Sequence, residues 1–400
     1  MSQSNTPPNV PVWEDGRWTP LPALHGDVSA DSCVIGLGGS GLTLIEELLR
    51  RDERVVGLDA GDVGAGAAGR NGGFLLAGAY DFYHDAVRKH GRDRARAIYA
   101  ATLAELPRIA DAAPGTVRFT GSRRLVADDW DLEDCQAQRE VMLTDGLACE
   151  WVDDELGTGL FLPSDASFNP LARCRALAVR AREEGARLFA RTPVLQIDGT
   201  RVVTPTGSVH CGRVFVAVDG RLEVLLPELV GRVRTARLQM LATAPSAERR
   251  IPCPMYYREG YEYWQQLPDG SVALGGFRDR AGESEWSTDA TPTAPVQDML
   301  ESFMRSHIGI TTPITHRWAA CAGYTETGLP VIEQVREHVW ALGGYSGTGN
   351  VIGALAARGV AAAALDGDAS GVRLLLGDTW SPVVTRGVRH DASHDVSPTS

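Results

Sequence analysis

The sequence has little positive charge and almost no lysine. Its 39 Lys and Arg residues are outnumbered by 51 Asp and Glu residues, which gives a formal net charge of -12, and Lys89 is the one lysine in 400 residues. Binding to nucleic acid or to an anionic membrane surface needs clustered basic residues. We therefore expect neither partner, and any chemistry that needs a lysine is confined to Lys89.

The sequence also lacks paired cysteines and long apolar runs. Its seven cysteines are an odd number and include no CxxC pair, so we expect neither a disulfide framework nor a metal site. No apolar run approaches the roughly 20 residues that span a bilayer, and the N-terminal stretch lacks the basic and apolar regions of a signal peptide. These absences predict a soluble protein of the reducing cytoplasm.

A glycine motif stands near the start of the chain. Residues 31–61 have the pattern strand, glycine turn, amphipathic helix, strand, and Gly36, Gly38 and Gly41 form a GxGxxG in the turn. Such glycines let a pyrophosphate approach the backbone at a helix N-terminus, and Asp59 at the end of the second strand can accept hydrogen bonds from a ribose. The pattern predicts a dinucleotide site, which is expected to include Gly39, Ser40 and Ala60 as well.

The patterns along the chain alternate between two kinds of structure. Residues 80–145 have helix-like periodicity, and residues 232–280 alternate apolar and polar side chains with many aromatics, which predicts antiparallel sheet. We predict an α/β fold in which a Rossmann-like domain of residues 1–80, 155–228 and 312–370 is interrupted by a second, α+β domain of residues 81–154 and 229–311. Residues 385–400 have too little apolar content to fold and are expected to form a mobile tail.

The loop after Asp59 identifies the cofactor by resemblance. Its G-A-A-G-R-N-G-G stretch resembles the G-A-S-G-R-N-G-G loop of the glycine/D-amino-acid oxidase superfamily of FAD-dependent enzymes, with Ala68 where Ser is common. The resemblance implies FAD in a glutathione-reductase-like fold, with this loop along the flavin and ribityl chain. It assigns to the cofactor site Gly66, Ala67, Ala68, Arg70, Asn71, Gly72 and Gly73.

The resemblance continues through most of the chain. Residues 191–197 look like the adenine-side strand of the family, with Val194 at a backbone contact, and residues 213–220 look like a later flavin-domain strand that includes Ala217. The last glycine turn would place backbone N–H groups near the flavin, from Gly344, Gly347, Thr348 and Gly349. The lead-in to the first strand and the R-N-G-G loop look most like the γ-glutamylputrescine oxidase type.

The substrate side of the resemblance implies oxidation of a C–N bond. Flavin enzymes of this superfamily take a hydride from the carbon beside an amine and leave an imine. Tyr261 and Tyr263 share one face of a predicted strand, while Trp264 points to the other. We predict that the two tyrosines wall an aromatic pocket for an amine, and that they and Thr348 are the catalytic residues.

The segment from Trp318 to Pro330 bears on the substrate class. Family members that act on amino acids often carry there an arginine that binds the substrate carboxylate, and the matching residue is Ala322. The sequence therefore favours an amine substrate. Two alternatives stay open: a D-amino-acid or glycine-type oxidase or dehydrogenase with its anchor moved to Arg237, Arg258 or Arg278, and an FAD-binding subunit with decayed catalytic groups.

Two further positions concern the flavin itself. Sarcosine-oxidase relatives use a lysine to promote reaction with oxygen, and the matching residue is Ala273, so either oxygen or another electron acceptor remains open. Relatives that tether their flavin carry the cysteine three residues before the Thr that matches Thr325, whereas Cys321 is four before it. One residue reverses the side-chain direction in an extended segment. We predict non-covalent FAD, with Cys321 as the alternative tether.

Overall fold

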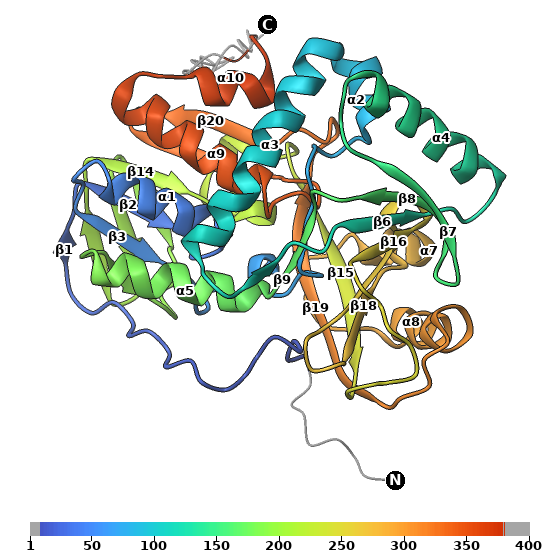
Figure 1. The fold of residues 1–400 in the computed structure, drawn as a ribbon. Coiled ribbons are helices and arrows are strands. Elements are labelled where there is room, and N and C mark those ends of the chain that lie inside the picture. The colour runs from blue at the N-terminus through green and yellow to red at the C-terminus, as the bar shows by residue number, and fades with distance from the viewer. Residues whose placement is uncertain (1–8, 379, 381–400) are drawn as a thin grey trace, which may run out of the picture.

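The computed structural model describes residues 9–378 and residue 380, and the predicted tail of residues 385–400 lies outside them. A six-stranded sheet forms the lobe on the left of Figure 1, in the order β10-β3-β2-β14-β21-β20. The first five strands are parallel and β20 is antiparallel to β21. The strands are β2 (Ser32–Ile35), β3 (Val55–Leu58), β10 (Arg187–Phe189), β14 (Arg213–Val216), β20 (Val331–Arg336) and β21 (Val339–Gly343).

Both faces of this sheet are covered, which explains why every residue of β2 and β3 is buried and why both strands are largely apolar. Val34 packs in a core with four helices, whereas Cys33 and Ile35 pack in a core with a small sheet on the opposite face. The helices are α1 (Gly39–Leu49), α5 (Pro170–Glu183), α9 (Ile352–Ala361) and α10 (Ser370–Leu376). The small sheet contains β1 (Val28–Ser29), β13 (Gly207–His210), β12 (Arg201–Thr204) and β11 (Gln196–Asp198).

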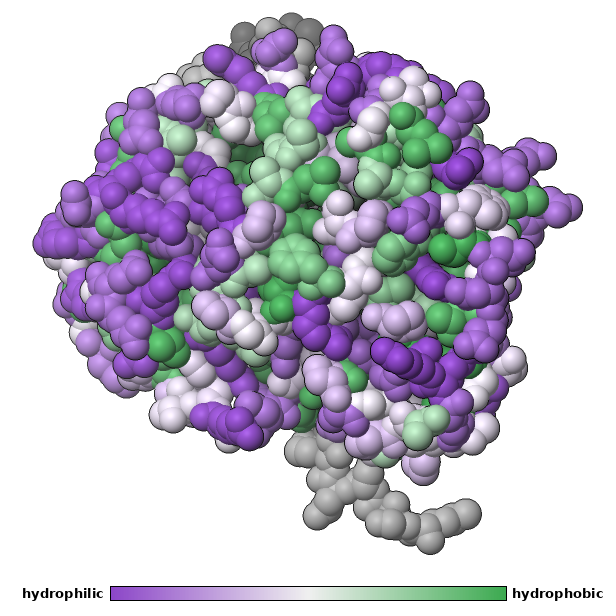
Figure 2. Space-filling model, in the orientation of Figure 1, coloured by the Kyte–Doolittle hydropathy of each residue, from purple (hydrophilic) through white to green (hydrophobic). Residues whose placement is uncertain are grey.

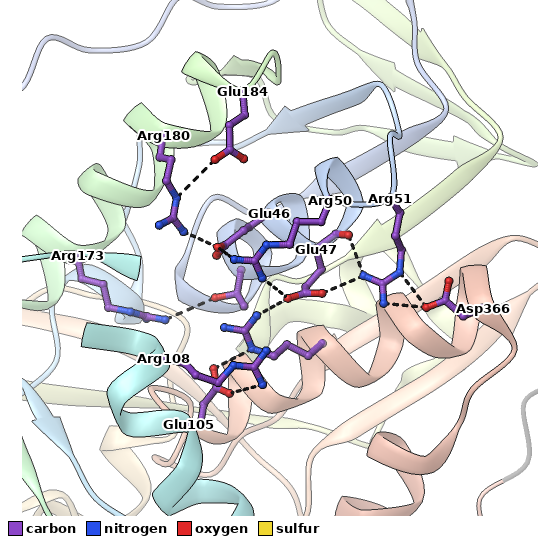
Figure 3. Close-up of polar contacts among 12 residues, drawn as sticks. Glu46, Glu47, Arg50, Arg51, Glu105, Arg108, Arg173, Arg180, Glu184 and Asp366 are labelled. Carbon is purple, nitrogen blue, oxygen red and sulfur yellow. Dashed lines mark hydrogen bonds and ion pairs between the residues drawn. The ribbon is translucent and has the colours of Figure 1, made fainter. Parts of the chain in front are cut away.

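Arginine–glutamate pairs tie α1 to its neighbouring helices, as Figure 3 shows. Arg180 of α5 lies 2.5 Å from Glu46. Arg358 of α9 pairs with Glu47 and also, at 2.9 Å, with Glu105 of α3 (Arg92–Ala112). One planar guanidinium with five N–H groups can serve two carboxylates at once, which a lysine does less well. The helical layer over the nucleotide sheet is thus joined by polar contacts as well as by its apolar core.

An eight-stranded sheet forms the second lobe, on the right of Figure 1, in the order β19-β15-β18-β17-β16-β6-β8-β7. Its neighbours are antiparallel except for the parallel pair β16–β6. The strands are β6 (Ser122–Leu125), β7 (Glu150–Asp154), β8 (Gly157–Leu162), β15 (Arg234–Thr243), β16 (Met255–Tyr257), β17 (Glu262–Gln266), β18 (Val272–Gly275) and β19 (Ile314–Tyr324). Helix α8 (Ala294–Phe303) packs against it.

The predicted domain boundaries at residues 155 and 312 cut through this sheet. Strand β8 forms a hairpin with β7, and β19 pairs with β15 along the whole of its length. The chain therefore returns to the nucleotide lobe only after β8 and after β19. Both strands belong to the large sheet although their sequences were assigned to the nucleotide domain.

The helix-like region at residues 80–145 forms three helices with strands between them. These are α2 (Tyr83–His90), α3 and α4 (Asp129–Thr144), and both β6 and β5 (Val117–Arg118) lie between α3 and α4. Strand β5 joins a small sheet with β9 (Ala166–Phe168) and β4 (Phe74–Leu75). None of the helices in the described part of the chain is long and apolar enough to cross a membrane.

Candidate cofactor and substrate site

The glycine turn after β2 is built so that only glycine fits at two positions. Gly36 has φ 110°, and a Cβ there would lie 2.4 Å from the carbonyl oxygen of Ala217. A Cβ on Gly41 would lie 1.9 Å from the carbonyl oxygen of Gly36. The close approach brings the first turn of α1, including Ser40, to the carboxyl edge of the parallel sheet, where N–H groups can meet an anionic ligand.

Asp59 lies where β3 ends and joins two turns. Its carboxylate oxygens accept hydrogen bonds from the backbone N–H groups of Leu37 and Gly61, both at 2.8 Å. Burial raises the pKa of Asp59, while these two hydrogen bonds act in the opposite direction. Ala60, the next residue, is exposed. The carboxylate thus stands at the edge of the glycine turn, the position from which a ribose is reached in dinucleotide folds.

Arg173 of α5 is a buried cation beside that turn. Its side chain is 3% exposed, and Nη1 lies 2.8 Å from the position that a Cβ on Gly39 would take. Its one side-chain contact is a long one, 3.5 Å from Nη2 to the hydroxyl of Thr43, and Nε has no partner (Figure 3). Burial lowers the pKa of Arg173. A buried guanidinium that pairs with no carboxylate of the described residues fits a site for an anionic diphosphate.

The glycine-rich loop is organised by Asn71. The side-chain amide donates to the carbonyl oxygens of Ala67 and Ala68 at 3.0 and 2.9 Å, and its oxygen accepts from the N–H of Gly73 at 2.9 Å. The side-chain amide of Asn350 also donates to that oxygen, at 3.2 Å. The loop therefore closes on itself and meets the last glycine turn, which contains Gly344, Gly347, Thr348 and Gly349.

The same loop is joined to β19. Arg70 donates from Nε to the carbonyl oxygen of Ala319 at 2.9 Å, and the indole of Trp318 donates to the carbonyl oxygen of Arg70 at 2.8 Å. Burial lowers the pKa of Arg70. The structure thus brings together three segments that are distant in the sequence: the loop of residues 66–73, the middle of β19 and the turn of residues 344–350. Val194 lies between β10 and β11 in the chain and packs against the core under the small sheet.

Asp219 holds two of these segments in place, and sequence reasoning did not single it out within residues 213–220. Its carboxylate accepts from the N–H of Gly323 at 2.9 Å and of Tyr345 at 3.1 Å, and its carbonyl oxygen accepts from the N–H of Gly344 at 3.3 Å. Its φ of 55° places it in the left-handed region, and burial raises its pKa. Asp219 follows Ala217 closely, so β14 positions both the end of β19 and the last turn.

A cavity of about 540 Å³ lies between these segments and the large sheet. Its wall includes residues of the glycine-rich loop and of the last turn, and, from the opposite side, Tyr261, Tyr263 and Tyr324. Figure 2 shows apolar residues gathered along the middle of the visible face, between the two lobes of Figure 1. The cavity therefore has a backbone-rich wall on the nucleotide side and an aromatic wall on the sheet side.

The three side chains predicted to be catalytic all line this cavity. The ring of Tyr263 lies over Gly72, where a Cβ would come within 2.9 Å, and meets Phe74 edge-on at 6.0 Å. Trp264 points to the other side of the sheet and packs in its core, as the alternation requires. The hydroxyl of Thr348 donates to the carbonyl oxygen of Tyr345 at 2.7 Å, so it stabilises the turn.

Cys321 and Ala322 lie on opposite faces of β19. Cys321 stands across from Arg237 of β15, and its thiol donates to the carbonyl oxygen of Ser287 at 3.4 Å. The thiol is absent from the cavity wall, and burial raises its pKa. Tyr324, two residues after Ala322, does line the cavity, and Ala322 shares its face of the strand but is buried and does not itself line the cavity.

Asp165 is a buried acid in the cavity wall that sequence reasoning missed. Its carboxylate accepts from the N–H of Ala77 at 2.9 Å and from the hydroxyl of Ser122 at 2.6 Å, and its side chain is 1% exposed. Burial raises the pKa of Asp165 from its ordinary value of 3.8 to about 7. No motif surrounds it in the sequence, and its burial is visible only in the folded chain.

This pKa predicts how stability depends on pH. Between pH 4 and 7 the folded state holds a proton on Asp165 more tightly than the unfolded state does, so stability falls as the pH rises through this window. We expect Asp165→Asn to be more stable than the unaltered protein at pH 8 by about 2 kcal/mol, with little difference at pH 4. Urea unfolding at both pH values measures this. The exposed acid Glu183 gives the control, Glu183→Gln, and the prediction is wrong if both variants keep the original pH dependence.

Comparison with known proteins decides the family. A family model described as FAD dependent oxidoreductase, the DAO family, matches residues 31–363. The chain belongs to this family. The match covers both lobes, so the DAO fold accounts for the nucleotide sheet and for the large sheet, and membership is confirmed as predicted from the glycine-rich loop.

Curated relatives and solved structures agree with this assignment. The γ-glutamylputrescine oxidoreductase of Escherichia coli is 26% identical over 381 residues, which cover 88% of this chain and 87% of that one. The probable oxidoreductase OrdL of Haemophilus influenzae is 24% identical and covers 89% and 86%. Among solved structures, L-proline dehydrogenase from P. horikoshii has a TM-score of 0.70 at 20% identity, with 89% and 99% covered, and glycine oxidase from Geobacillus kaustophilus has 0.70 at 17%, with 84% and 94% covered. The protein is thus a DAO-family flavin enzyme.

Proposed function

We propose that this DAO-family enzyme oxidises the C–N bond of an amino-containing small molecule to an imine. The observation that carries the proposal is the cavity, which joins the segments expected at the flavin to the aromatic wall of Tyr261, Tyr263 and Tyr324. FAD, when bound, supplies the acceptor for a hydride from the carbon beside the nitrogen. The nitrogen lone pair then forms the new C=N bond as an iminium ion, which loses a proton from nitrogen to water to give the imine, and water hydrolyses the imine. The names of the relatives, which refer to γ-glutamylputrescine, glycine and proline, support amino compounds as the substrate class.

The side chains in the cavity orient the substrate and need not remove a proton from carbon. Burial raises the pKa of Tyr263 far above neutral and that of Tyr324 to about 12. Both phenols therefore stay protonated at neutral pH and act as hydrogen-bond donors and apolar walls. A substrate amine that enters neutral needs no side-chain base, because the carbon loses hydride and the electron pair on nitrogen is already available.

Flavin reduction under anaerobic conditions tests this function. The holoenzyme is mixed with a panel of amines, D-amino acids and L-amino acids, and the absorbance of oxidised flavin is followed. We expect members of at least one class to bleach the flavin. If no member of the panel does, the protein is better described as an FAD-binding subunit. Readmission of oxygen or of an artificial acceptor then distinguishes an oxidase from a dehydrogenase.

The position of Cys321 predicts that the flavin is held without a covalent bond. Its thiol faces Ser287 and Arg237 on the far side of β19 from the cavity, and its raised pKa leaves little thiolate to attack a flavin methyl group. Acid precipitation of the holoenzyme should leave all yellow colour in the supernatant. A yellow pellet that becomes colourless in Cys321→Ser would show that the prediction is wrong.

The buried charge of Arg173 predicts a contribution to FAD affinity. Hydrogen bonds to a charged group are worth about 1.5–3 kcal/mol, so Arg173→Met should raise the Kd for FAD about 10- to 100-fold in fluorescence titrations of the apoprotein. The apoprotein itself should not lose stability, because the variant removes an unpaired buried charge.

Arg180→Met is the matched control for this prediction. Arg180 lies on the same helix but pairs with Glu46, away from the glycine turn (Figure 3). Its substitution should lower the free energy of unfolding of the apoprotein. The Kd for FAD should stay within about twofold of that of the unaltered protein. Equal Kd values for Arg173→Met and the unaltered protein would contradict the role of Arg173.

A further inference from the structure

Arg278 is a cation in the cavity wall whose charge is not neutralised by the protein. It is the first residue of the short helix α7 (Arg278–Ala281), directly after Phe277 with φ 62°. Within the described part of the chain its guanidinium makes no ion pair and no hydrogen bond through its side chain. The side chain lines the cavity that also contains Tyr261 and Tyr324. A cation placed in this way is available to a ligand.

Three aromatic rings hold this guanidinium. Its Cζ lies 4.7 Å from the ring centre of Tyr324, 5.1 Å from that of Trp286 and 5.9 Å from that of Tyr261. A guanidinium that stacks on aromatic faces keeps the N–H groups at its edge free to donate. The rings thus contact the guanidinium, while its N–H groups have no hydrogen-bond partner among the described residues.

The neighbouring arginines are arranged differently. Arg237 pairs with the buried carboxylate of Glu285 at 2.7 Å, and Arg258 pairs with Glu262 and, at 2.9 Å, with Asp279. Asp279 directly follows Arg278 in the sequence, but its carboxylate pairs with Arg258. Of the three arginines that could replace the missing anchor at position 322, two are therefore already neutralised.

The location of Arg278 also suits a substrate group. Tyr324, which shares a face of β19 with Ala322, carries the ring nearest to Arg278 of the three. The guanidinium thus reaches from the end of β18 toward the part of the cavity that β19 borders.

We propose that Arg278 binds the carboxylate of the substrate through two parallel hydrogen bonds, and that the substrate is therefore an amino acid, primary or N-substituted. This rests on the proposed function, since it names the substrate class of the same cavity. The planar fork of an arginine matches the two oxygens of a carboxylate. The partly buried position of Arg278 strengthens such a pair relative to one in bulk water. The anchor that family members carry on β19 is thereby supplied from β18 and α7.

Two matched probes test the anchor without turnover. Benzoate and benzylamine are titrated into the holoenzyme, and their Kd values are taken from the change in the visible spectrum of bound FAD. We expect benzoate to bind, Arg278→Met to raise its Kd at least about 30-fold, and Arg278→Lys to keep part of the affinity. The Kd of benzylamine should change less than about threefold. Arg280→Met, an exposed arginine of the same helix, should bind benzoate like the unaltered enzyme.

Turnover separates this proposal from the function on which it rests. Amino acids and their decarboxylated amines are compared in pairs for anaerobic flavin reduction. In Arg278→Met the half-saturating concentration of amino acid should rise about 100-fold, while the rate at saturation changes little. Failure of both classes to reduce the flavin would overturn the proposed function. Reduction by amines alone, or a benzoate Kd that is the same in Arg278→Met, would overturn the anchor and leave the function standing.

Discussion

Gly41→Ala is expected to yield a protein that no longer carries FAD through purification. The added methyl group would stand 1.9 Å from the carbonyl oxygen of Gly36, far inside van der Waals contact, and 3.5 Å from the side chain of Val34. Backbone atoms cannot rotate away as a flexible side chain can, so the turn and the first residues of α1 must separate. The N–H groups of that turn would then lose the geometry that an anionic cofactor requires.

The measurement is the ratio of flavin to protein absorbance after purification, followed by titration with FAD. We expect a Kd more than about 100-fold above that of the unaltered protein, together with a lower Tm, because strained packing of this kind costs about 1–3 kcal/mol or more. Gly66→Ala is the control. Gly66 belongs to the FAD loop as well, but its φ is -85° and a Cβ there meets nothing within 4 Å. Retention of stoichiometric FAD by Gly41→Ala would contradict the close approach seen here.

Arg237→Met is expected to give the largest loss of stability among the substitutions considered. The side chain of Glu285 is 1% exposed. Its two carboxylate oxygens accept hydrogen bonds from Arg237 at 2.7 and 3.1 Å and from the side-chain amide of Gln239 at 2.9 Å. Removing the arginine leaves a carboxylate buried with one neutral donor. Breaking a buried pair from one side costs about 3–5 kcal/mol, because the remaining charge is uncompensated. Equilibrium unfolding in urea at pH 7.5 measures the loss.

A second substitution shows whether charge is the cause. In Arg237→Met with Glu285→Gln the buried group is neutral and still bonds to Gln239, so most of the lost stability should return. The single variant Arg234→Met removes an arginine of the same strand whose partner, Glu283, is exposed, and it should cost less than about 1 kcal/mol. If the double variant is as unstable as Arg237→Met, lost packing rather than lost charge explains the effect.

The nucleotide half of the protein could be predicted in detail because its motif reflects local backbone geometry. Gly36 and Gly41 are needed where two backbone segments touch. Asp59 follows a strand of four residues without a polar side chain, which predicts that the strand is buried. Such requirements act within a few residues of the chain. The role of a glycine or an acid at these positions can therefore be predicted from the sequence without knowledge of the tertiary structure.

Strand pairing was harder to predict because it is set by distant partners. The patterns of β8 and β19 identify them as strands, but only β7 and β15, respectively, determine that they belong to the large sheet. The domain boundaries shifted for this reason. The hydropathy of a strand records how deeply it is buried, and it does not record which neighbour buries it.

The roles of the arginines depended on what lies around them in space. The sequence left Arg237, Arg258 and Arg278 equivalent, and the positions of Glu285 and Asp279 distinguish them. Arg173 had no signal at all, since an arginine on an amphipathic helix is usually a solvated residue. An unpaired buried charge is recognised by the absence of a partner, which becomes visible only when all neighbours are known.

Asp219 connects, through hydrogen bonds, two segments that are far apart in the chain. Its carboxylate holds the N–H of Gly323 at the end of β19 and that of Tyr345 in the last glycine turn. Tyr324, which stacks on Arg278, adjoins the first of these, and the cofactor-side turn contains the second. The substrate wall on β19 and the turn on the cofactor side therefore share a single buried anchor, the Asp219 carboxylate.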